Sequence, residues 1–109
     1  MTKLLMADNG LCNKEAGEAL ANMLASNTTL KELDVSNNTY YKCDSPGFAQ
    51  ELAIGVKNNR ALTSLDISNQ VNENGWGGIG AEGAKHIAEA IKVNVRSLRF
   101  VWYRCDPDL

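Results

Sequence analysis

The chain has 109 residues, of which 44% are hydrophobic and 22% are charged, and its formal net charge is −2. This length and apolar content predict one domain with its own core, spanning residues 1–109. The small negative charge argues against a polybasic surface for nucleic acid or anionic lipid, and no apolar run approaches the ~20 residues of a membrane span. We therefore expect no nucleic-acid partner and no membrane partner.

The cysteine content and the N-terminus bear on the compartment. The three cysteines, Cys12, Cys43 and Cys105, are odd in number and show no paired spacing, which argues against a disulfide framework and favours a reducing compartment. The first residues lack the long apolar core and small-residue cleavage site of a signal peptide. The sequence therefore predicts an intracellular, cytoplasmic protein.

The first segments of the chain alternate and then become periodic. Apolar residues alternate over about 3–7 and end at Asp-Asn-Gly, which predicts a short strand leaving through a turn. The next segment places Leu20 and Leu24 at helical spacing behind Asn13, a residue type that caps helices. We predict a helix over about 14–26.

The second pair of elements begins with LKELDVSNN, residues 30–38. Its alternation predicts a strand over about 32–36. A helix over about 46–58 follows, with Pro46 at its first position and either Asp44 or Ser45 as the cap.

The third pair begins with LTSLDISNQ, residues 62–70, in which five of the nine positions match residues 30–38. We predict a strand over about 64–68, a helix over about 81–92 and a last strand over about 97–102. The connection before this last strand reads as about two residues shorter than the earlier ones.

This repetition decides between two architectures. Strands that alternate with helices predict right-handed crossovers and a parallel sheet, which also describes a small doubly wound fold. A self-similarity with a period of 29–33 residues instead indicates a solenoid, in which all helices lie on one side of a curved sheet.

The pattern L-x-x-L-x-L-x-x-N followed by a helix resembles the leucine-rich repeat, and Gly83 to Ile91 resembles its ribonuclease-inhibitor type. The resemblance implies an α/β leucine-rich-repeat solenoid, a segment of a horseshoe with parallel strands on the concave face and helices on the convex face. It also implies an asparagine ladder through Asn9 and Asn38, with Gln70 and Tyr103 at that position in the later copies. The residues behind the sheet would be Leu4, Met6, Leu30, Leu33, Val35, Leu62, Leu65, Ile67, Leu98 and Phe100.

Function in such a fold lies in the side chains between the inward ones, which face solvent on the concave surface. We predict that this surface binds a protein or peptide partner, and that Asp34, Asp66 and Arg99 form one row with Leu5 at its start. The plainer interpretation is a solvated surface on which Arg99 neutralises Asp66. The predicted partner-binding residues are Glu32, Asp34, Ser36, Ser64, Asp66, Ser68 and Arg99, together with Trp76.

Trp76 stands in a glycine-rich loop at about 72–80. An exposed tryptophan beside a binding face suits an interface anchor, although Trp76 could equally fold back onto the sheet edge or a helix. The loop lacks the Gly-Lys-Ser/Thr ending of a phosphate loop and the dinucleotide-binding glycine pattern. We therefore predict no cofactor.

No set of residues predicts catalysis. The lone His86 has no nucleophile or orienting partner at a recognisable spacing. Cys12 and Cys43 stand at similar points of successive units, but a metal site would need further ligands. We therefore predict a protein that is not an enzyme and holds no metal.

The chain ends raise a second functional hypothesis. Phe100, Trp102 and Tyr103 would lie at an open sheet edge, and such an edge invites pairing. The chain would then be part of a longer solenoid, associate with itself as a structural repeat unit, or fold its tail over the edge. A regulatory role, as in a GTPase-activating member of the same repeat class, is a third hypothesis.

Overall fold

The computed structural model describes residues 1–38, 44–68, 79–93 and 99–101, the last of these as backbone. Strands and helices alternate along the chain. The elements are β1 (Lys3–Leu5), α1 (Lys14–Ser26), β2 (Glu32–Asp34), α2 (Ser45–Asn58), β3 (Ser64–Asp66), α3 (Gly80–Val93) and β4 (Arg99–Val101). We call β1 with α1 the first unit, β2 with α2 the second and β3 with α3 the third.

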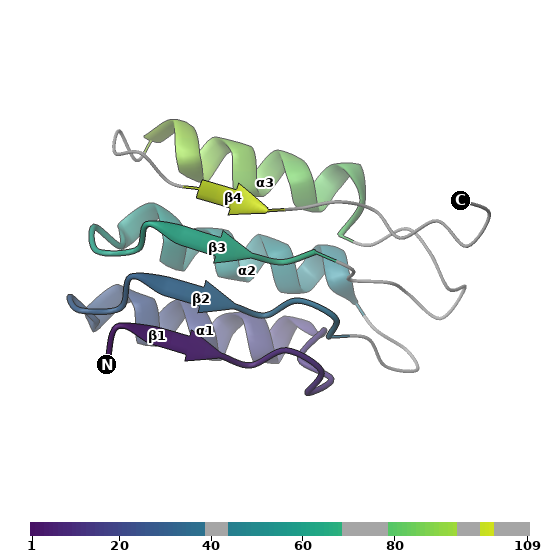
Figure 1. Ribbon diagram of the computed structural model, residues 1–109. Coiled ribbons are helices and arrows are strands. Elements are labelled where there is room, and N and C mark those ends of the chain that lie inside the picture. Colours follow the sequence, from purple (N-terminus) through teal and green to yellow (C-terminus); the bar gives the residue numbers. More distant parts are fainter. Residues whose placement is uncertain (39–43, 69–78, 94–98, 102–109) are drawn as a thin grey trace.

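The four strands form one parallel sheet in the order β1-β2-β3-β4, which is also their order in the sequence. The three described helices all lie behind this sheet in Figure 1, so none of them covers its other face. We call that uncovered side the open face. The predicted α/β class with a parallel sheet is therefore confirmed.

The helices begin where the sequence provides a cap. The Ala16 amide donates to Asn13 Oδ1 at 2.9 Å, and the Gly47 amide donates to Asp44 Oδ1 at 3.0 Å. These bonds satisfy amides that have no partner within a helix, so they fix the first turn. Asp44, rather than Ser45, is thus the cap of α2.

Neighbouring helices pack closely at glycines. A Cβ added to Gly55 of α2 would lie 2.6 Å from the Cα of Ala21 in α1, and one added to Gly17 would overlap the carbonyl of Phe48. A contact at that distance is sterically impossible, so glycine at these positions lets the helix backbones approach.

The core lies between the sheet and the helices. Leu30, Leu33, Val35 and their third-unit equivalents Leu62, Leu65 and Ile67 are all buried, as predicted. They pack with Leu24, Phe48, Leu52, Val56 and Ile87 from the helices. Leu4 and Met6 are only half-buried, because β1 has a neighbouring strand on one side alone. Leu98 lies outside the described residues.

The strands are shorter than predicted, and the register of the last one differs. Each strand has three residues, and Arg99, Phe100 and Val101 pair with Ser64, Leu65 and Asp66. The connections 27–31, 59–63 and 94–98 that precede β2, β3 and β4 have five residues each. The prediction of a shorter final connection and a strand from 97 was therefore wrong by two residues.

The chain leaves β1 and β2 through the same turn. Asp8 and Asn37 both adopt positive φ, at 60° and 54°, a region that asparagine and aspartate tolerate better than most residues. The Asp8 amide donates to the Ser36 carbonyl, and the Asn37 amide donates to the Ser68 carbonyl. Backbone pairing between units thus continues beyond the three-residue strands.

The buried Asn38 follows this turn and joins two units. Its Oδ1 accepts from the amides of Asn9 and Leu11 at 2.6 and 3.0 Å, and its Nδ2 donates to the carbonyls of Met6 and Val35 at 3.0 and 2.7 Å. The predicted ladder role is therefore confirmed for Asn38. Asn9 makes a smaller contact of this kind: among the described residues its exposed side chain donates only to the Ala7 carbonyl of its own unit.

None of the helices in the described part of the chain is long and apolar enough to cross a membrane.

Candidate partner-binding surface

The open face presents two rows of residues across the first three strands. One row contains Lys3, Glu32 and Ser64, and the other contains Leu5, Asp34 and Asp66. Adjacent strands lie ~4.8 Å apart, so neighbours in a row are close enough to meet one ligand group. Lys3 pairs with Glu32 at 3.2 Å, and the Leu5 side chain is 64% exposed.

Asp34 and Asp66 are the adjacent carboxylates of the second row. Asp34 Oδ1 accepts from the Ser36 amide at 2.9 Å. Asp66 Oδ1 accepts from the Ser68 amide at 3.0 Å and from its hydroxyl at 2.7 Å. Each carboxylate is thus held in place through one oxygen. Among the described residues, neither has a cation within 4 Å.

Ser36 and Ser68 are not on the open face. Their exposed fractions are 6% and 3%, so the prediction that they face solvent is wrong. Simple alternation assumed strands that continue to these residues, but the strands end at Asp34 and Asp66. Beyond the strand ends both serines are buried, and their amides donate to Asp34 and Asp66.

Arg99 does not lie in the row of aspartates. It pairs in register with Ser64, so it belongs to the row of Lys3 and Glu32, and Val101 occupies the position beside Asp66. The predicted row of Asp34, Asp66 and Arg99 is therefore wrong. The predicted register of β4 against β3 was shifted by two residues, as was its predicted start.

Several predicted residues lie outside the part that the structure describes. Trp76 of the glycine-rich loop and Trp102 and Tyr103 of the C-terminal edge are among them. Phe100 is placed in β4 as backbone only, with Leu65 as its neighbour. Gln70, the predicted ladder position of the third unit, also lies outside.

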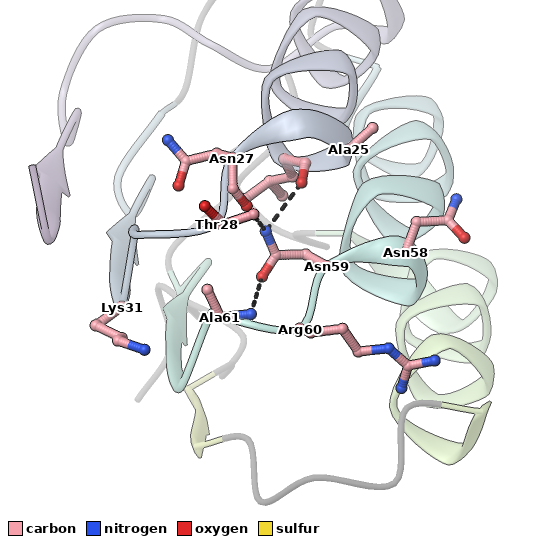
Figure 2. A pocket seen from close by; sticks show the side chains of 9 residues that line it. Ala25, Asn27, Thr28, Lys31, Asn58, Asn59, Arg60 and Ala61 are labelled. Atoms are coloured by element: carbon pink, nitrogen blue, oxygen red, sulfur yellow. Dashed lines mark hydrogen bonds between the residues drawn. The ribbon is translucent and has the colours of Figure 1, made fainter.

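A cavity of about 250 Å³ opens where α1 and α2 end, on the side of the sheet from which the strands begin (Figure 2). Asn59 forms part of its wall. Its Nδ2 donates to the carbonyls of Leu24 and Asn27, both at 2.9 Å, and its Oδ1 accepts from the amides of Ala61 and Leu62.

The chemistry of this cavity does not favour a cofactor. Helix C-termini direct partial negative charge at it, and the exposed residues Lys31 and Arg60, which contribute to its lining, carry the opposite charge. The polar groups of Asn59 are already used to join two units. We therefore assign this cavity to the scaffold.

Sequence reasoning missed the role of Asn27 and Asn59. The signal was present, because an asparagine stands three residues before the buried leucine in both ASNTTL and KNNRAL. Asn27 Oδ1 accepts from the Thr29 and Leu30 amides just as Asn59 Oδ1 does in its own turn. A second series of asparagines therefore shapes each helix-to-strand turn.

A second cavity of about 250 Å³ lies between α2 and α3, lined by Ile54, Lys57, His86 and Glu89 among others. His86 Nε2 lies 3.9 Å from Glu82 Oε2, and both side chains are accessible. That distance exceeds a hydrogen bond, so this pair resembles an ordinary surface contact on one helix.

Cys12 differs from its prediction. It is 3% exposed and forms a disulfide bond, so the expectation of unpaired thiols, on which the reducing compartment rested, is wrong for Cys12. The two other cysteines, Cys43 and Cys105, lie outside the described residues. Within the described ranges, no group of three or more histidines, cysteines and carboxylates is placed to hold a metal ion.

Comparison with protein-family models gives no match for this chain, and comparison with curated protein sequences gives none either.

Proposed function

We propose that the protein is a binding module that takes a protein partner on the open face of its sheet. The observation that carries this proposal is the pair Asp34 and Asp66, adjacent on neighbouring strands and fixed through one oxygen each. A carboxylate already oriented by the scaffold loses little conformational freedom when it binds, which favours recognition.

The partner we expect is basic and partly apolar where it contacts this surface. Lys3 is paired with Glu32, so the carboxylates of Asp34 and Asp66 set the local charge among the described residues. A lysine or arginine of the partner would meet these carboxylates, and an apolar side chain would cover Leu5 in the same row. Trp76 remains our proposed anchor beside this face.

We also infer that the strand–helix units form a leucine-rich-repeat solenoid of the ribonuclease-inhibitor type. Three features support this inference: the sequence order of the parallel strands, the helices on one face, and the bridging asparagines Asn38 and Asn59. In this arrangement the open face is the concave surface, which extended partners commonly occupy.

A charge-matched pair of double variants tests the binding proposal. Asp34→Asn with Asp66→Asn removes two charges but keeps an oxygen to accept the serine amides. Glu82→Gln with Glu89→Gln removes two charges from exposed positions of α3. Each protein would be used to capture partners from cells, followed by quantitative mass spectrometry and titration of the captured partner.

The aspartate variant should lose at least tenfold in affinity, since charged hydrogen bonds contribute about 1.5–3 kcal/mol each. The α3 variant should bind as the original chain does, and both should unfold at similar urea concentrations. Equal binding by the two variants would remove the open face from the partner site.

A further inference from the structure

The second row of the open face has an apolar residue at each end and two carboxylates between them. Leu5, Asp34, Asp66 and Val101 follow one another on adjacent strands of the parallel sheet. We call this set the aspartate row. It crosses all four strands of Figure 1, and its Leu5 side chain is 64% exposed and available for contact.

The spacing of the strands sets the distances along the aspartate row. Adjacent strands lie ~4.8 Å apart, so the midpoint between Asp34 and Asp66 lies ~7 Å from Leu5. By the same spacing, Val101 lies ~14 Å from Leu5. A ligand group centred between the two aspartates would therefore stand midway between the two apolar positions.

The two carboxylates are placed to share one cationic nitrogen. The Ser36 amide donates to Asp34 Oδ1, and the Ser68 amide donates to Asp66 Oδ1 in the same way. Because the same hydrogen bond orients both side chains, their equivalent atoms are displaced by about one strand spacing, ~4.8 Å. A tetrahedral ammonium nitrogen that donates to two oxygens at ~2.8 Å holds those oxygens ~4.6 Å apart. One lysine side chain can thus bind both aspartates at once.

The distances along the row match an extended backbone better than a helical one. In an extended segment, side chains two residues apart stand on the same side at intervals of ~6.8 Å, so three of them span ~13.6 Å. In an α-helix, residues four apart rise by only ~6 Å and turn by ~40° at each step, so three of them span ~12 Å and leave the row. A polyproline II segment advances ~9.3 Å per turn of three residues and fits neither interval.

We propose that the aspartate row binds an extended segment of the partner protein that crosses the strands and carries a lysine with a large apolar residue two positions before it and another two positions after it. This inference rests on the proposed function, because it specifies the partner of the same surface. The lysine binds between Asp34 and Asp66, and the two apolar side chains cover the positions of Leu5 and Val101. The two intervening residues point away from the sheet.

Residues 1–109 offer no such segment that is available to reach the row. Of the 11 lysines and arginines, only Lys3 has a large apolar residue two positions away on each side, namely Met1 and Leu5. Lys3 and Leu5 belong to β1 and pair with β2. The sequences of 39–43, 69–78, 94–98 and 102–109, which lie outside the described residues, do not contain the pattern. This favours a separate protein as the occupant.

Two fluorescently labelled peptides of equal composition test the spacing. One carries Leu-Ser-Lys-Ser-Leu between glycine and serine flanks, and the other carries Leu-Lys-Ser-Ser-Leu between the same flanks. In an extended chain the shift by one residue turns the lysine to the other side. Fluorescence anisotropy with the full chain should show at least about tenfold tighter binding of the first peptide, because the second loses its charged hydrogen bonds to the aspartates.

Variants of the chain then assign the peptide positions to the row. Asp34→Asn with Asp66→Asn should remove the preference for the first peptide, whereas Glu82→Gln with Glu89→Gln, on exposed positions of α3, should keep it. Leu5→Ser should weaken the first peptide about fivefold but have no effect once serine replaces the leucine that covers this position. Which of the two leucines that is gives the direction in which the segment crosses the strands.

Three results would overturn this inference while the open face remained the partner site. One is equal affinity for the two peptides, although the aspartate variant still loses the captured partner. Another is a Leu5→Ser effect that depends on the lysine of the peptide rather than on a leucine. The third is tighter binding by a peptide that carries the same three residues at intervals of four, the helical spacing. If the aspartate variant captures partners as the original chain does, the proposed function fails together with this inference.

Discussion

Asn38 and Asn59 act at opposite ends of the strands through the same property of the amide side chain. An amide donates and accepts at once, so one residue can satisfy carbonyls and amides that the turns leave without partners. Asn38 does so for the exit turns of the first two units, and Asn59 does so where α1 and α2 end. A carboxylate of the same shape lacks the donor.

We predict that substitutions of Asn38 and of Asn9 differ in their effect on the free energy of unfolding. Asn38→Ala should lower the free energy of unfolding by about 3 kcal/mol, because several buried backbone groups lose their partner. Asn9→Ala, at the equivalent exposed position, should cost under about 1 kcal/mol. Urea unfolding followed by circular dichroism measures both, and equal losses would contradict the burial difference.

The resemblance to the leucine-rich repeat predicted the contact of Asn38, but strand alternation did not predict the burial of Ser36 and Ser68. Alternation fixes which side a residue takes only while the strand continues. The strands end early because the side chains of Asp34 and Asp66 accept from the serine amides, which are then not available to the next strand. The recurrence of Asn27 and Asn59 was visible in the sequence. The role of Asn59 was not, because its side chain donates to carbonyls at the end of α1, and that contact appears only in the folded structure.

Among the elements, the helices were the most predictable because their signals are local. Asn13, Asp44 and Pro46 set the starts of α1 and α2, and each predicted helix boundary lies within one residue of the observed one. The register of β4 was not predictable in this way. Shifting that strand by two residues keeps every apolar residue on the same face, so alternation cannot distinguish the two registers.

We predict that Gly55 controls the approach of α1 and α2. Gly55→Ala should reduce the free energy of unfolding by about 2 kcal/mol, since the new methyl group meets the backbone of Ala21 and overpacking costs more than the gain in helix propensity. Ile54→Ala at the adjacent exposed position should have a much smaller effect. Thermal unfolding provides the comparison, and a stabilised Gly55→Ala variant would show that the helices can separate freely.

For the whole molecule, the disulfide of Cys12 adds a covalent link to a small core. The Asp44 amide donates to the Cys12 carbonyl at 3.0 Å. This bond joins the start of α2 to the segment that connects β1 to α1. The number and spacing of the three cysteines could not predict this disulfide, because a disulfide depends on which cysteines lie close together in the fold.

We expect Cys43, the residue before Asp44, to be the partner. Cys12→Ser and Cys43→Ser should each lower the free energy of unfolding by about 3 kcal/mol, through the loss of a cross-link that restrains the unfolded chain. Reducing agent should then have no further effect on either variant. Cys105→Ser should leave both stability and the response to reductant unchanged; the reverse result would assign the bond to Cys105.

The helix contacts have a consequence for the order of events during opening. In the described structure α2 packs against both α1 and α3, whereas α1 and α3 do not pack against each other. In such a linear array, a middle unit cannot open without losing two interfaces, but an end unit loses one. Fluctuations should therefore begin at the ends and travel inward, and the second unit should be the last to release its amides to solvent.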